Sequence, residues 1–111
     1  MIEVLTTFHK AGWDQYGKRM VETFIEHWPE DIKIHLDCEN VSPNLYHPRV
    51  VEHNIFDVCP QIKSYLDKNN NDYNYGYRES KRDFKYDAIK FCYKVFAQCH
   101  RIKFSTADTI M

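Results

Sequence analysis

Residues 84–101, FKYDAIKFCYKVFAQCHR, and residues 106–111, TADTIM, are the stretch that decides the fold of this chain. Between Asp87 and Arg101 the apolar residues recur at the i, i+3, i+4 and i+7 spacing of one buried helix face. They are Ala88, Ile89, Cys92, Val95, Phe96 and Cys99. The apolar run that begins at Thr109 is typical of the opening of a strand. The stretch therefore predicts a helix over 87–101 that leads into a strand.

The residues upstream predict further elements that would pack around this pair. These are a strand over 2–8, a helix from Gly12 or Trp13 to His27, a strand over 31–37 packed by helices on one side, a short edge strand over 50–56 and a helix over 59–69. Residues 41–49 are expected to form an exposed connection, and residues 69–80 a mobile surface loop. The order β-α-β-(β)-α-α-β predicts a three-layer, Rossmann-like α/β fold whose mostly parallel sheet is flanked by helices.

Length and composition favour one compact domain over residues 1–111. The chain is 43% hydrophobic and 15% aromatic, which is enough to bury a core. Its net charge is only -1, yet the basic residues gather near the C-terminal end. They are Arg78, Lys81, Arg82, Lys85, Lys90, Lys94, Arg101 and Lys103, against Glu79, Asp83 and Asp87. A solvated helix face is the ordinary interpretation, and attraction of a phosphate-bearing ligand or nucleic acid is the alternative.

The four cysteines, Cys38, Cys59, Cys92 and Cys99, include no C-x-x-C pair. We interpret them as reduced core thiols of a cytoplasmic protein. No apolar run has the length of a membrane span or signal peptide. The histidines near Cys38 and Cys99 lack the paired spacing of a zinc site, so no metal site is expected within the chain.

Two segments carry a resemblance to a known family. One is the helical pattern F-x-x-K-V-F-A at residues 91–97, followed by Asp108 and an apolar strand, and the other is Y-G-K-R at residues 16–19. Both resemble glycosyltransferase-like proteins of the nucleotide-diphospho-sugar transferase superfamily. The resemblance implies the GT-A fold and a nucleotide-sugar donor as the ligand.

In that family the strand after the helix continues into an aspartate-rich D-x-D turn, which binds a divalent cation (Mn or Mg) and the pyrophosphate of the donor. The present sequence ends at Met111, before such a turn. The resemblance therefore implies a truncated, N-terminal portion of a transferase, inactive as this fragment. The strand from Thr109 would lie beside the strand over 2–8, leaving an edge through which a homo-oligomer could form.

The alternative to a transferase is a small non-enzymatic protein that docks nucleic acid or a partner protein through its basic C-terminal helix. The predicted loop over 69–80 is rich in tyrosine, but no recognised RNA or DNA module surrounds it. The sequence therefore does not favour nucleic acid as the partner.

Candidate nucleotide-binding residues lie at the ends of the predicted strands, where open α/β sheets bind ligands, and in the two segments that carry the resemblance. They are Thr6, Thr7, Phe8, Tyr16, Asp37, Glu39 and Lys94. The first three end the strand over 2–8, and Asp37 or Glu39 follows the next strand, where an acidic residue often binds a ribose hydroxyl. Threonines also simply suit strands, and Tyr16 also suits a core or boundary position. Lys94 would add positive charge near the departing diphosphate; no catalytic residue is assigned.

Overall fold

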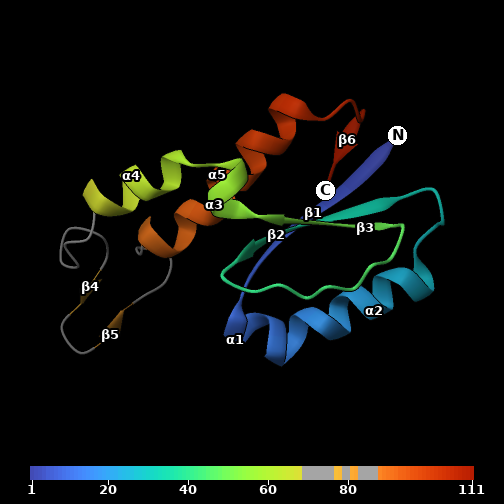
Figure 1. Cartoon of the computed structure of the whole chain (residues 1–111), viewed down its shortest axis with the longest axis horizontal. Coiled ribbons are helices and arrows are strands. Elements are labelled where there is room, and N and C mark those ends of the chain that lie inside the picture. The colour runs from blue at the N-terminus through green and yellow to red at the C-terminus, as the bar shows by residue number, and fades with distance from the viewer. Residues whose placement is uncertain (69–76, 79–80, 83–87) are drawn as a thin grey trace.

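The computed structural model describes residues 1–68, 77–78, 81–82 and 88–111. Four strands form an all-parallel sheet in the order β3-β2-β1-β6 (Figure 1). Their bounds are Ile2–His9 for β1, Lys33–Glu39 for β2, Val50–Asn54 for β3 and Thr109–Ile110 for β6. The predicted α/β class, the parallel sheet and the neighbouring positions of the first and last strands are confirmed.

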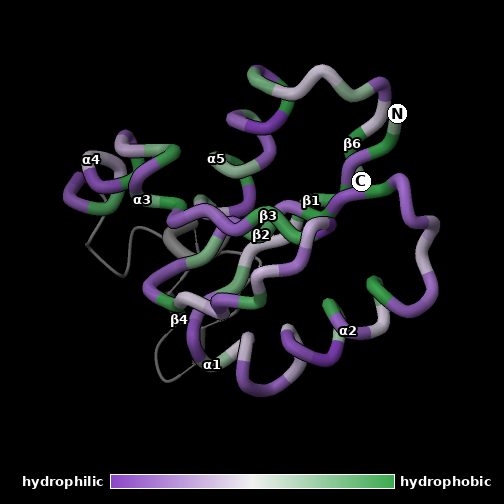
Figure 2. The backbone as a smooth tube through the Cα atoms, turned by 45° about the vertical axis from the view of Figure 1, so that its right-hand side comes forward, coloured by the Kyte–Doolittle hydropathy of each residue, from purple (hydrophilic) through white to green (hydrophobic). Residues whose placement is uncertain are grey.

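Helices cover both faces of this sheet, which gives the three layers of a Rossmann-like layout (Figure 1). On one face lie α1 (Lys10–Gly12), a π-helical turn (Trp13–Gly17) and α2 (Lys18–His27). On the other lie α3 (Ile55–Val58), α4 (Gln61–Lys68) and α5 (Ala88–Phe104). Along α2 hydrophobic and hydrophilic residues alternate, as they do in an amphipathic helix (Figure 2).

Part of the predicted loop over 69–80, and the helix start at Asp87, lie outside the described residues. Two short strands, β4 (Tyr77–Arg78) and β5 (Lys81–Arg82), pair antiparallel as a separate ribbon. The side chains of Ala88, Ile89 and Phe91 also lie outside the described part. Among the described helices, none is both long and apolar enough to cross a membrane.

The core on the α2 face packs helix side chains against β1 and β2. Its fully buried members include Phe8, Val21, Ile34 and Leu36. Gly17 lets the helix approach the sheet, because a Cβ there would lie 2.8 Å from Trp13 and 2.9 Å from Phe8. The connection over 41–49 was predicted to be exposed, and this is wrong in part: its Val41 and Leu45 pack against the same core. This connection joins two parallel neighbours without a helix, so its own apolar side chains must cover the sheet.

The core on the α5 face is smaller and contains Ile55, Cys59, Ile62 and Ala97. The predicted buried face of α5 is wrong in two positions, because Val95 is 55% exposed and Cys99 is also exposed. His100 and Arg101 turn toward the sheet instead, where β1 and β2 present polar side chains. Three of the four thiols, those of Cys38, Cys59 and Cys92, are buried and reduced as predicted.

β2 was predicted to pack on one side only, and it is buried on both. All five residues from Ile34 to Cys38 are buried, including His35 and Asp37. The physical reason is its central position, since strands of parallel sheets are covered on both faces. The alternation in its sequence separates an apolar face, toward α2, from a polar face that is buried beneath α5. The predicted edge strand over 50–56 ends at Asn54, whose side chain accepts a hydrogen bond from the Phe56 N–H and caps α3.

Candidate functional site

A cavity of about 260 Å³ opens at the carboxyl end of β1, between this strand and α5. Its lining consists of Leu5, Thr6, Thr7, Tyr16, Lys94, Ala97 and Gln98. Four residues predicted from the sequence, namely Thr6, Thr7, Tyr16 and Lys94, therefore lie around one space. They converge because the chain turns from β1 directly into its first helix, which carries Tyr16, and because α5 packs across the same strand end with Lys94.

β1 presents an open backbone edge beside this cavity. The Met111 N–H donates to the Glu3 carbonyl oxygen (2.9 Å), and the Leu5 N–H donates to the Met111 carbonyl oxygen (2.8 Å). Alternate residues of a strand direct their backbone groups to the same neighbour, so Thr7 directs its N–H and C=O to this edge. Among the described strands none pairs with β1 on this side beyond Leu5. The edge therefore offers a ligand both a donor and an acceptor.

Lys94 and Tyr16 are accessible in this cavity, whereas Phe8 is not. Lys94 is exposed and makes no ion pair with a described residue. The Tyr16 side chain is 54% exposed, and its ring lies 5.8 Å from that of Phe8 in a tilted arrangement. Phe8 is 2% exposed and belongs to the core beneath Tyr16. Phe8 therefore supports the site and has no surface with which to contact a base.

Asp37 and Glu39 lie one strand behind the cavity lining. In the parallel register Asp37 is opposite Thr7, and Glu39 is opposite His9. Burial raises the pKa of Asp37 to about 6, with the positive charge of Arg101 acting in the opposite direction. Burial also raises the pKa of Glu39, and His9 opposes this effect. Neither carboxyl group lines the cavity, although Asp37 lies on the strand next to Thr7.

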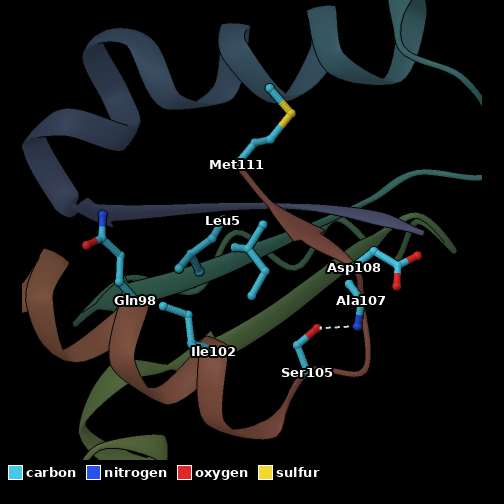
Figure 3. A pocket seen from close by; sticks show the side chains of 8 residues that line it. Leu5, Gln98, Ile102, Ser105, Ala107, Asp108 and Met111 are labelled. Carbon is cyan, nitrogen blue, oxygen red and sulfur yellow. Dashed lines mark hydrogen bonds between the residues drawn. The ribbon is translucent and has the colours of Figure 1, made fainter.

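A second cavity, of about 420 Å³, adjoins the first along the outer edge of β1 (Figure 3). Both cavities are lined by Leu5 and Gln98, so they lie side by side. The remaining lining of the second is Ile102, Ser105, Ala107, Asp108, Ile110 and Met111. Its carboxylate, on Asp108, already pairs with the N-terminal ammonium at 2.6 Å. Although larger, this cavity has fewer polar side chains among its described lining residues than the one beside Lys94.

Sequence reasoning missed a buried polar cluster between the amino-terminal half of the sheet and α5. His35 Nε2 lies 2.6 Å from Glu3 Oε2, and the Ser105 hydroxyl donates to Glu3 Oε1 at 2.6 Å. The Arg101 guanidinium donates through Nη1 to His35 Nδ1 at 2.7 Å. Because arginine has no acceptor, Nδ1 of His35 must be unprotonated, which leaves its proton on Nε2, facing Glu3. The ring of His53 stacks on that of His35, with centroids 5.6 Å apart.

The pKa shifts of this cluster follow from its burial and its single arginine. Burial lowers the pKa of His35 to about 4; Arg101 acts in the same direction, and Glu3 opposes both. Burial works to raise the pKa of Glu3, but the Ser105 hydrogen bond and the charges of His35 and Arg101 outweigh it and lower the pKa. At neutral pH the cluster therefore consists of a carboxylate, a guanidinium and a neutral imidazole. Such a cluster fastens α5 to the sheet.

No cluster of three or more metal-ligating side chains occurs in the part of the chain that the structure describes. The described residues therefore do not form a site for the divalent cation that the resemblance implies, and among them Lys94 is the one cationic side chain that lines the cavity at the end of β1. A function has to be argued from these side chains, because no family model, no curated protein and no solved structure matches this chain.

Proposed function

We propose that residues 1–111 form the nucleotide-sugar-binding portion of a glycosyltransferase with the GT-A fold. The observation that supports this most is the convergence of Thr6, Thr7, Tyr16 and Lys94 around one cavity. That cavity lies at the carboxyl end of a parallel strand, which is where open α/β sheets bind nucleotides.

The side chains around the cavity suit the parts of a nucleotide diphosphate. The exposed ring of Tyr16 offers a face on which a base can stack. The hydroxyls of Thr6 and Thr7, with the free backbone groups of Thr7, can bind ribose or phosphate oxygens. The ammonium of Lys94 is a mobile point charge that suits a phosphate. Ligand pockets usually measure about 300–1,000 Å³, so we expect the sugar to extend into the adjoining cavity.

In a transferase of this kind the leaving group is a nucleoside diphosphate, on which negative charge develops as the glycosidic bond breaks. A cation placed beside the leaving group stabilises such charge in the transition state. We assign this role to Lys94. No step of the proposal depends on a divalent cation, since the described residues provide no ligand set for one.

No specific observation favours the alternative, a non-enzymatic protein that docks through its basic helix. Arg101 is only 13% exposed in its side chain and is engaged by His35 and Glu3. Of the other basic residues, the side chains of Arg78, Lys81, Arg82, Lys85 and Lys90 lie outside the described part. The cation of Lys94 faces a cavity at a strand end, which suits a small ligand better than a flat macromolecular surface.

Amide-resolved NMR titration with UDP-glucose and GDP-mannose tests the proposal, because it detects dissociation constants as weak as about 1 mM. We expect shifts at Thr7, Tyr16 and Lys94. Lys94→Ala should weaken binding about three- to tenfold, the loss expected for one exposed ion pair with phosphate. The melting temperature should stay within about 2 °C of the wild type, since an exposed lysine contributes little to stability.

Lys103→Ala is the matched control, because Lys103 is exposed on the same helix and lines neither cavity. Equal losses in the two variants would show that only the general charge of α5 matters. Absence of shifts around the cavity with both nucleotide sugars would overturn the proposed function.

A further inference from the structure

We infer that binding of a nucleoside diphosphate sugar in the cavity is coupled to proton uptake by Asp37, so that the site binds its anionic ligand more tightly at acidic than at neutral pH. This inference rests on the proposed function and adds to it a form of regulation by pH.

The coupling begins with the position of Asp37 relative to the cavity. Thr7 lines the cavity, and Asp37 is its register partner on β2. Register partners on adjacent strands project to the same face of a sheet, and the strands lie about 5 Å apart. A phosphate group bound beside Thr7 would therefore lie roughly 5–10 Å from the Asp37 carboxylate, one or two strand spacings away.

Asp37 is poorly protected against an added negative charge. It is 3% exposed, so little water screens it, and it has no hydrogen bond or ion pair to any described residue. The nearest guanidinium, that of Arg101, is already shared between His35 and Glu3. An incoming diphosphate would thus repel a buried carboxylate that has no counter-ion of its own among the described residues.

Other titratable or charged groups lie on this face as well. They are His35 and Glu39 on β2, His9 on β1, His53 on β3, Lys94, His100 and Arg101 on α5, and the Cys59 thiol after α3. A histidine that gains a proton attracts the ligand and acts in the same direction as Asp37. Asp37 differs from these groups because it is a buried carboxyl group next to Thr7 and has no hydrogen bond or ion pair to a described residue.

The sign and size of the effect follow from electrostatics. A negative charge at roughly 5–10 Å, acting through an effective dielectric constant of about 20, raises a carboxyl pKa by about one unit or more. Since burial already raises the pKa of Asp37 to about 6, ligand binding would move its titration toward neutral pH. By linkage, affinity should rise about tenfold between pH 8 and pH 5.

The experiment uses UDP-glucose, because its diphosphate is esterified on both sides and carries a constant charge over this pH range. The side-chain carboxyl carbon of Asp37 is followed by ¹³C NMR against pH, with and without saturating UDP-glucose. Affinities at pH 5.5 and 7.5 are measured for the wild type, for Asp37→Asn and for Asp57→Asn, an exposed matched control.

We expect the ligand to raise the titration midpoint of Asp37 by about one unit. Between pH 7.5 and pH 5.5 affinity should rise about sixfold in the wild type and in Asp57→Asn. It should rise distinctly less in Asp37→Asn, in which the remaining pH dependence measures the contribution of the histidines. Binding at the cavity with an unchanged Asp37 midpoint would overturn the coupling and leave the proposed function intact. Absence of binding at every pH would overturn both. The carboxyl titration is made on the wild type, so it decides the matter even if Asp37→Asn fails to fold.

Discussion

Arg49→Ala should destabilise the fold more than its position in a connecting segment suggests. The guanidinium donates to four backbone carbonyls around the end of α2: those of Ile25 (3.1 Å), Trp28 (3.1 Å), Pro29 (2.8 Å) and Ile32 (3.1 Å). Carbonyls at a helix C-terminus have no partner within the helix, so a side chain or water must satisfy them. The same guanidinium lies 4.7 Å from the centroid of the Phe24 ring.

The expected loss of unfolding free energy is about 3.5 kcal/mol. The bonds to Ile25 and Ile32 are partly buried, and a hydrogen bond to a charged group contributes about 1.5 kcal/mol at the low end. The bonds to Trp28 and Pro29 are exposed, so water would replace them at little cost. The contact with Phe24 adds about 0.5 kcal/mol.

Urea unfolding followed by circular dichroism measures this loss as a shift of the midpoint at constant slope. Arg49→Lys should lie between the wild type and Arg49→Ala, because an ammonium keeps the charge over Phe24 but lacks the planar fork that reaches separate carbonyls. Arg19→Ala, at an exposed position on α2, should stay within about 0.5 kcal/mol. If Arg49→Ala cost less than about 1 kcal/mol, water would serve these carbonyls as well as arginine does, and the reasoning would fail.

Two further predictions concern packing and pH. Gly17→Ala should destabilise the protein by about 1 kcal/mol or more, although alanine has the better helix propensity. The reason is that the added methyl group would lie under 3 Å from Trp13 and Phe8. A raised urea midpoint would contradict this prediction. The pKa of His35 falls to about 4 on folding, so the unfolded state binds a proton first and stability falls as pH drops from 6.5 to 4. The pKa of Asp37 rises to about 6 on folding, so the folded state binds a proton first and stability grows as pH drops from about 6 to 3.8. The wild type should therefore change little over this range, while Asp37→Asn should lose about 2–3 kcal/mol; urea midpoints at pH 6.5 and 4 distinguish the two, and equal pH profiles would refute the opposition.

The elements of the sheet were predictable because their signals are local. The apolar runs of β1 and β6 and the alternation of β2 define strands whatever surrounds them. The two-sided burial of β2 was not predictable, since it depends on which strand occupies the centre of the sheet. A buried polar face and a solvated polar face have the same alternating sequence. Only the arrival of α5 over His35 and Asp37 distinguishes them.

The orientation of α5 was not predictable from the sequence either. Its apolar spacing predicted that Val95 and Cys99 are buried, yet the helix is turned so that Arg101 faces the sheet. Without Arg101 the Glu3 carboxylate would be buried with no positive charge beside it, because His35 is neutral, and such a carboxylate costs more than the exposure of one valine. The pairing joins residues at opposite ends of the chain, so no window of the sequence contains it.

Part of the candidate site was likewise predictable from the sequence, and part was not. Thr6 and Thr7 were predictable from their place at a strand end, and Tyr16 and Lys94 came from the resemblance and from helix periodicity. Asp37 was predicted only as a possible contact to ribose, whereas it does not line the cavity and we propose that it acts through its charge. The strand register places Asp37 beside Thr7, although the two are thirty positions apart in the sequence. A change at Asp37 should therefore alter the pH dependence of binding rather than remove a contact, which distinguishes a carboxylate behind the site from one that lines it.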